Sequence, residues 1–133
     1  RQMCIRDRDY MESINTKKAP AAVGPYVQGM VHDGLIFTSG QLPINPENGE
    51  LVMDIEAAAK QSLTNVLEIV KEAGGKLENI IKVNIYVKDM NDFGKVNKVY
   101  EEFFGSHKPA RSCVEVARLP KDGVIEIEAI AYK

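Results

Sequence analysis

The alternation of apolar and polar residues is clearest near the C-terminal end of the chain. Residues 111–117 and 124–132 both alternate with a period of two, which predicts two strands joined by a polar connection around residues 120–123. Because this connection is short, we expect the two strands to be antiparallel neighbours. If their apolar sides match, one side of the sheet carries a polar patch made of Arg111, Cys113, Glu115, Glu126 and Glu128. The patch is a candidate functional site, although alternation alone favours an ordinary solvated sheet face.

Two apolar stripes with helical spacing predict two helices. The first begins after Asp54, which can cap its N-terminus, and ends at Gly74 and Gly75. The second spans about residues 92–104 and ends at Gly105. Both stripes are one-sided, so each helix is expected to pack with one face against a sheet.

Shorter strands are predicted before and between the helices. Residues 81–87 alternate strictly and form a strand between the two helices. The Asp33-Gly34 pair separates two short apolar runs at residues 27–31 and 35–39, which predicts a β-hairpin.

The order of these elements predicts a single α+β domain. Its two helices would cover one face of a mixed, mainly antiparallel sheet. The opposite face is then partly bare and carries Lys82, Tyr86 and the polar patch together with apolar Val124 and Ile130. A half-apolar bare face on a small protein predicts burial against another copy of the chain.

Composition and charge narrow the class of protein. The chain has 133 residues, of which 44% are hydrophobic and 27% charged, and these values suit one globular domain. A formal net charge of −2 without a basic run argues against nucleic acid as a main partner. No apolar stretch is long enough to span a bilayer, so no membrane partner is expected.

The few cysteines and histidines predict neither a disulfide framework nor a metal site. Cys4 and Cys113 are the only cysteines, and this usage fits a reducing compartment such as the cytoplasm. His32 and His107 each stand alone, without a second ligand at metal-binding spacing.

The first ten residues differ from the rest of the sequence. Residues 1–10 are polar and patternless and lack the apolar core of a signal peptide, and we expect the natural start to be Met11. We therefore expect residues 1–10 to be a non-native or disordered leader and residues 11–133 to form the domain.

Longer motifs resemble those of the RidA (YjgF-type) family of enamine/imine deaminases. The resemblance runs from about Ser13 to the end and includes APAAVGPYVQG, FTSGQLPINPENGE, DFGKVNKVYEEFF and PARSCVEVARLPKDGVIEIEAIA. It implies a chorismate-mutase-like fold and a homotrimer with active sites in clefts between subunits. It also implies hydrolysis of 2-imino acids, in equilibrium with 2-enamino acids such as 2-aminoacrylate, to 2-keto acids and ammonia. The resemblance further implies that no cofactor is used.

The same resemblance assigns roles to individual residues. Arg111 would clamp the substrate carboxylate, for which a forked guanidinium is well suited. Glu126 would act on water as a general acid and base. Cys113 would contribute its backbone and small size rather than a nucleophilic thiol. Three further residues would line or support the cleft: Tyr26, Gly40 and Asn97. Glu128 is expected to be structural or interfacial.

Two other functions stay open from the sequence. One is a non-catalytic member of the same fold that binds a small ligand or, under stress, another protein. The presence of both Arg111 and Glu126 favours the enzyme over this alternative. The other is a ribonuclease or translation inhibitor, which the weakly acidic charge and the lack of a basic, aromatic patch disfavour.

Overall fold

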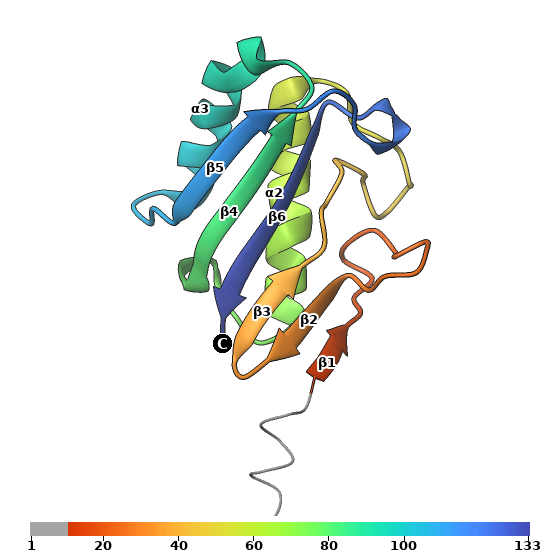
Figure 1. The fold of residues 1–133 in the computed structure, drawn as a ribbon, viewed down its shortest axis with the longest axis vertical. Coiled ribbons are helices and arrows are strands. Elements are labelled where there is room, and N and C mark those ends of the chain that lie inside the picture. The colour runs from red at the N-terminus through yellow and green to blue at the C-terminus, as the bar shows by residue number, and fades with distance from the viewer. Residues whose placement is uncertain (1–10) are drawn as a thin grey trace, which may run out of the picture.

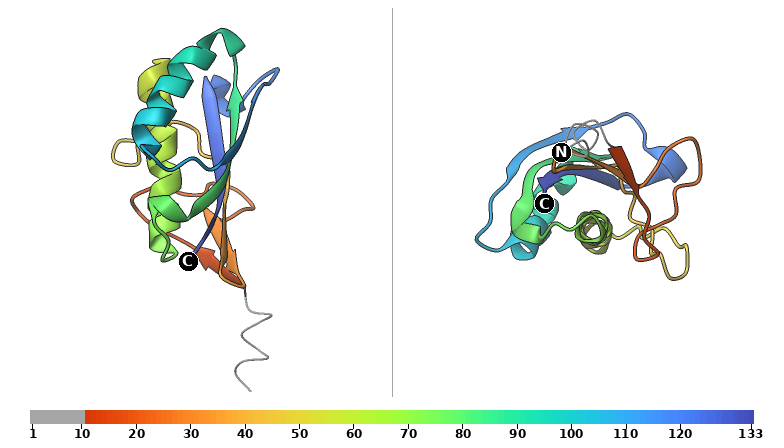
Figure 2. Two further views of the ribbon diagram at one scale, coloured as in Figure 1. Left: turned by 90° about the vertical axis from the view of Figure 1, so that its left-hand side faces the viewer. Right: turned by 90° about the horizontal axis from the view of Figure 1, so that it is seen from below.

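The described residues form one mixed sheet with two helices on the same face. The computed structural model describes residues 11–133, and the predicted leader at residues 1–10 lies outside the described part. Within that part, a six-stranded sheet has the order β1-β2-β3-β6-β4-β5. The strands are β1 (Met11–Ile14), β2 (Gly29–His32), β3 (Leu35–Thr38), β4 (Ile80–Val87), β5 (Ala110–Glu115) and β6 (Ile125–Tyr132). The helices are α2 (Ile55–Glu72) and α3 (Phe93–Phe104), with short 3₁₀ turns η1 (Leu77–Asn79), η2 (Met90–Asp92) and η3 (Pro120–Asp122) in the connections. Figure 1 and Figure 2 show α2 and α3 against one face, which confirms the predicted α+β architecture.

The predicted hairpin is formed by β2 and β3. His32 pairs with Leu35 across a two-residue turn. Asp33 and Gly34 both have positive φ angles, 52° and 77°. Two such residues in succession match the right-handed twist of the paired strands, and Gly and Asp adopt this conformation at low cost.

The first helix begins and ends where the sequence predicts. The Asp54 carboxylate accepts a hydrogen bond from the backbone N–H of Ala57 at 3.1 Å, which satisfies one donor of the first turn. Helix α2 stops at the C-cap residue Ala73, and Gly74 follows with a φ of 99°.

The hydrophobic core lies between the helices and the sheet. Every second residue of β4 and β6 faces the helices and is almost completely buried: Val83, Ile85, Val87, Ile125, Ile127, Ala129 and Ala131. The apolar side of α2 covers them with Leu63, Val66, Ile69 and Val70. This layer fixes which way each residue of β4 and β6 points.

Strands β5 and β6 are not neighbours, so the predicted antiparallel pairing between them is wrong. Strand β4 lies between them and pairs in parallel with β5 and antiparallel with β6. Helix α3 connects β4 to β5 as a crossover, which returns the chain in the same direction as β4. The connection from β5 to β6 then passes the end of β4, where Val116 N–H donates to Val87 O and Lys88 N–H donates to Val124 O.

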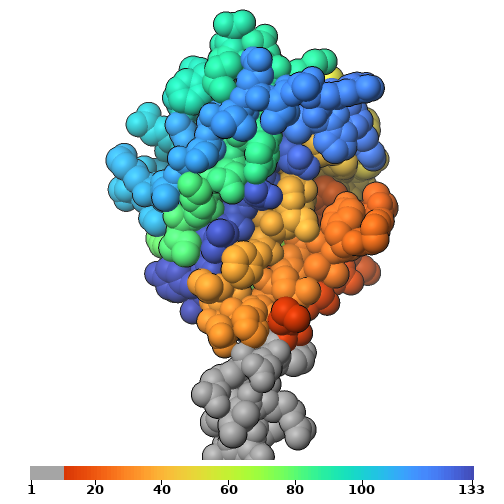
Figure 3. Space-filling view, in the orientation of Figure 1, coloured from red at the N-terminus to blue at the C-terminus, as the bar shows by residue number. Residues whose placement is uncertain are grey.

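The face opposite the helices is uncovered. Figure 3 shows side chains of β3, β4, β5 and β6 at the surface of this face. Apolar side chains on it are between 38% and 46% exposed: Leu35, Phe37, Val114 and Tyr132. The prediction of a partly bare, half-apolar sheet face is therefore confirmed.

Candidate active site

The sheet places Arg111 and Glu126 on opposite faces. Arg111 lies beside Val83, whose side chain is buried under the helices. Glu126 lies beside Tyr86 in the same sheet, and Tyr86 points to the uncovered face. Side chains in register point to the same side, so the single polar patch predicted from alternation does not exist within one chain. The candidate residues form two separate groups.

The first group surrounds the guanidinium of Arg111 on the edge strand β5. Its Nη1 donates a hydrogen bond of 2.6 Å to Oδ1 of Asn97. Its Cζ lies 4.8 Å from the ring centroid of Tyr100 and 5.5 Å from that of Phe93. We call Arg111, Asn97, Tyr100 and Phe93 the Arg111 group. Cation–π attraction from two rings and one hydrogen bond hold the guanidinium in place.

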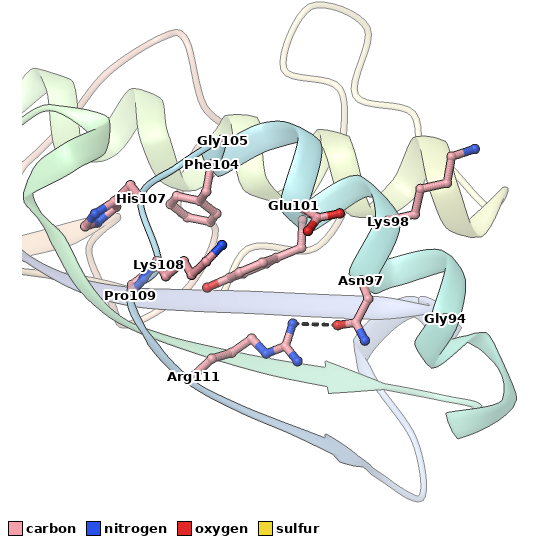
Figure 4. Close-up of a pocket in the computed structure, with 11 residues that line it drawn as sticks. Gly94, Asn97, Lys98, Glu101, Phe104, Gly105, His107, Lys108, Pro109 and Arg111 are labelled. Carbon is pink, nitrogen blue, oxygen red and sulfur yellow. Dashed lines mark hydrogen bonds between the residues drawn. The ribbon is translucent and has the colours of Figure 1, made fainter.

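A cavity of about 470 Å³ opens between α3 and the start of β5. Figure 4 shows Arg111 and Asn97 in its wall, with Lys108 on the segment that leads into β5. The hydroxyl of Tyr100 is buried here and has no hydrogen-bond partner among the described residues. Burial raises the pKa of Tyr100 to about 12, against an opposing effect of Arg111, so the phenol keeps its proton.

Cys113 lies two residues after Arg111 on the same side of β5, against Ile85. It is partly buried, and burial raises the pKa of its thiol more than the neighbouring Arg111 lowers it. A protonated thiol is a poor nucleophile, which agrees with the expectation that Cys113 does not attack the substrate. Among the described residues, Cys113 lines neither of the two cavities that contain Arg111 and Glu126.

The second group lies around Glu126 in a cavity of about 630 Å³. We call Glu126, Glu128, Gly40 and Tyr26 the Glu126 group, since all four line this cavity. A Cβ atom added to Gly40 would lie 2.8 Å from Oε2 of Glu126, so only glycine leaves room for the carboxylate there. Burial, followed by the charge of Glu128, raises the pKa of Glu126.

Sequence reasoning found the central residue of each group but missed several neighbours. Phe93 and Tyr100 belong to the apolar stripe of the second predicted helix, and that stripe did not reveal that their rings contact Arg111. The spacing of residues 93, 97 and 100 is the available signal, because a polar Asn97 then lies on the apolar stripe of a helix. No local pattern indicated that Tyr86 and Asn84 would contact Glu128, because that contact depends on the pairing of β4 with β6.

Residues 11–133 contain no cluster of three His, Cys, Asp or Glu side chains suited to a metal ion. His107 donates through Nε2 to the carbonyl of Ile80 at 2.7 Å, which ties the loop before β5 to β4. None of the helices in this range combines the length and apolar character needed to cross a membrane.

Known proteins resemble this chain over most of its length. The family model described as endoribonuclease L-PSP matches residues 16–133. A 2-iminobutanoate/2-iminopropanoate deaminase of Escherichia coli K12 is 57% identical over 125 residues, which cover 92% of this chain and 98% of that protein. The crystal structure of the E. coli YjgF gene product is 56% identical, with a TM-score of 0.89 over 92% of this chain and 98% of that one. E. coli TdcF with bound serine is 49% identical, with the same TM-score and the same coverage.

Proposed function

The chain belongs to the endoribonuclease L-PSP family, which confirms the YjgF/RidA resemblance, and we propose that it is a hydrolytic deaminase. Its substrates would be 2-imino acids and the 2-enamino acids in equilibrium with them, and its products 2-keto acids and ammonia. The name and the 57% identity of the E. coli deaminase support this assignment. The proposed reaction uses water and proton transfer, so it requires no cofactor.

The preoriented guanidinium of Arg111 is the observation that carries the proposal. Asn97 accepts a hydrogen bond from one nitrogen of the guanidinium, and the rings of Tyr100 and Phe93 pack against it. Among the described residues, no carboxylate forms an ion pair with Arg111. The remaining N–H donors are therefore available for the carboxylate of a small planar acid, which a guanidinium binds with two parallel hydrogen bonds.

Glu126 provides the acid–base chemistry of the proposal. Hydrolysis requires a proton on the imine nitrogen and removal of a proton from the water that attacks the imine carbon. A carboxyl group with a raised pKa can do both in turn, because it holds a proton nearer to neutral pH. Free imines hydrolyse unaided, so orientation and acid–base help are sufficient.

Two copies of the chain are needed to bring the groups together. Arg111 and Glu126 point to opposite faces of the sheet, so the Arg111 group of one copy must meet the Glu126 group of another. The exposed apolar side chains of the uncovered face favour such an association. We therefore place the active sites in clefts between the subunits of a homotrimer.

A coupled assay tests this function. An amino-acid oxidase or a threonine dehydratase generates the imine in situ, and its decay is followed with wild-type protein, Arg111→Ala and Arg118→Ala. Arg118 is the matched control because its side chain is 77% exposed and pairs with Asp122. We expect wild type and Arg118→Ala to accelerate decay and Arg111→Ala to lose at least about 100-fold in kcat/KM. A folded Arg111→Ala protein with full activity would contradict the role of Arg111.

Binding of a small ligand without turnover is the second candidate function. The relative TdcF was solved with bound serine, a small amino acid with a carboxylate. If wild type binds serine or a keto acid but leaves the decay of several imines unchanged, the binding function replaces the enzyme.

For either function we propose a cytoplasmic location, because a short-lived substrate must be met where it is made. We also propose that nucleic acid is not a main partner, given the net charge of −2.

A further inference from the structure

The carboxylate of Glu128 is held by two donors from the neighbouring strand. The hydroxyl of Tyr86 donates to Oε2 of Glu128 at 2.8 Å, and Nδ2 of Asn84 donates to the same oxygen at 3.1 Å. Asn84 lies directly opposite Glu128 in the pairing of β4 with β6, whereas Tyr86 reaches it diagonally. Two donors on one carboxylate oxygen fix the position of the Glu128 side chain.

The hydrogen bonding of Glu126 differs from that of Glu128. Tyr86 is its direct cross-strand neighbour, but the hydroxyl of Tyr86 is directed to Glu128. The side chain of Glu126 lies against Gly40 and, among the described residues, accepts no hydrogen bond. Of the two carboxylates on this face of β6, Glu128 is therefore held by two hydrogen bonds and Glu126 by none among the described residues.

Within one copy of the chain, few other charges face this pair, whereas in the proposed trimer Arg111 of a second copy also approaches Glu126. Lys121 of η3 lines the same cavity and is exposed. Lys82, further along β4, is engaged with the hydroxyl of Ser112 at 3.3 Å. The hydrogen bond to Glu128, together with burial and both carboxylate charges, raises the pKa of Tyr86, so the phenol stays a donor.

We propose that Glu128, held by Tyr86 and Asn84, is a positioning residue that keeps the catalytic proton on Glu126. This inference rests on the proposed deaminase function and deepens it, because it gives a task to a residue expected to be only structural or interfacial. Two neighbouring carboxylates resist ionising together, and the hydrogen bonds from Tyr86 and Asn84 hold the carboxylate of Glu128 on the same face of β6 as Glu126. Burial and the charge of Glu128 both raise the pKa of Glu126, in agreement with this positioning role.

With Glu126 as the group that exchanges protons, every proton moved during hydrolysis of the imine is accounted for. Protonated Glu126 gives its proton to the imine nitrogen while the oxygen of a water bonds to the imine carbon and the C=N π bond breaks. The carboxylate of Glu126 takes the proton that this water loses, which leaves a neutral carbinolamine. Glu126 then protonates the amine, the C–N bond breaks, and the hydroxyl proton returns to Glu126 as the keto acid forms. Glu128 keeps its hydrogen bonds to Tyr86 and Asn84 throughout and touches no reacting atom.

The pH dependence of kcat/KM distinguishes this role from a structural one. Glu128→Gln removes the charge but keeps the shape and an acceptor for Tyr86. We expect the limb of the pH profile that reports loss of the Glu126 proton to move to lower pH, with at least about a tenfold loss at pH 8 and convergence with wild type at acidic pH. Tyr86→Phe should move the same limb in the same direction by a smaller amount, and it replaces Glu128→Gln if that variant does not fold. Tyr132→Phe, the same change on the same face, is the control and should leave the profile unchanged.

A direct titration of Glu126 tests the positioning role of Glu128 independently of the proposed deaminase activity. The carboxyl carbon of Glu126 is followed by ¹³C NMR in the full-length protein and assigned with Glu126→Gln. We expect the wild-type midpoint above the ordinary glutamate range and a lower midpoint in Glu128→Gln, whether or not imines are hydrolysed. Equal midpoints in wild type, Glu128→Gln and Tyr86→Phe would overturn the positioning role even if the deaminase assay succeeds. A shifted midpoint with no imine turnover would instead support the coupling and reject the proposed function.

Discussion

Arg111 depends on its neighbours for its orientation, and Tyr100 is the nearer of the two rings. Its ring centroid lies 4.8 Å from the guanidinium carbon. We expect Tyr100→Leu to raise KM by roughly 2- to 30-fold, equivalent to about 0.5–2 kcal/mol of cation–π attraction, with a smaller change in kcat. Steady-state kinetics with a single imine measures both values.

Tyr100→Phe is the matched control for that change. It keeps the ring over Arg111 and removes a buried hydroxyl that has no partner among the described residues. We expect an almost unchanged KM and a thermal stability equal to or above that of wild type, because an unpaired buried hydroxyl costs about 1–3 kcal/mol. A large rise in KM for Tyr100→Phe would show that the hydroxyl, rather than the ring, acts on the substrate.

Gly40 controls the position of the second central residue, Glu126. A methyl group at position 40 would lie 2.8 Å from Oε2 of Glu126, so the carboxylate must move. The atom it meets is the end of a flexible side chain, and we therefore expect little loss of stability in Gly40→Ala. We expect kcat to fall on the order of 10- to 100-fold, because misplacing a reacting group by about 1 Å has effects of this size. Thermal denaturation measures the stability of Gly40→Ala, and steady-state kinetics on the same sample measures its kcat. An unchanged kcat would mean that Glu126 does not act from this position.

At the scale of single elements, helix α2 shows how directly local sequence specifies structure. Asp54 accepts the hydrogen bond of Ala57 N–H, and the helix starts at the next residue. We expect Asp54→Ala to lower the free energy of unfolding by about 0.5–2 kcal/mol, and Asp54→Ser to lose much less. Chemical denaturation of the three proteins measures this, and equal losses for Ala and Ser would exclude the cap as the cause.

Strand β5 shows where local sequence is insufficient. Alternation correctly places Arg111 with Cys113 on one side of β5, and Glu126 with Glu128 on one side of β6. It does not reveal the partner of each strand, which here is set by the crossover through α3. Matching the apolar sides of β5 and β6 therefore put Arg111 on the wrong face. Because β5 is at the edge of the sheet, a polar side chain on the helix side still reaches an open cavity.

In each group of site residues, the central residue could be predicted from the sequence, whereas its contacts could not. The motifs around Arg111 and Glu126 identify the central residues by resemblance, and that resemblance is confirmed at the level of the family. The hydrogen bonds of Glu128 and the ring contacts of Arg111 arise from register and helix packing, which the one-dimensional pattern does not contain. The roles of these residues stay predictions until the variants are measured.

At the scale of the whole molecule, the uncovered face predicts association. Val114 is 46% exposed on this face, near the C-terminal end of β5. We expect Val114→Glu to leave the subunit folded but to shift the protein from trimer to monomer in light scattering after size exclusion, because a charge buried in an interface is costly. Met53→Glu, in the loop before α2, is the control, since Met53 is 52% exposed and should stay solvated. A trimeric Val114→Glu protein would remove this face from the interface.

Complementation between two inactive variants tests the central claim, which is that Arg111 and Glu126 act on one substrate from different copies of the chain. Arg111→Ala and Glu126→Gln are each measured alone and after being refolded together in equal amounts. Random assembly brings an intact Arg111 of one variant to an intact Glu126 of the other at about a quarter of the clefts. The account predicts about a quarter of the wild-type activity in the mixture and almost none in either variant alone. A mixture as inactive as its components, in trimers shown to contain both variants, would contradict it.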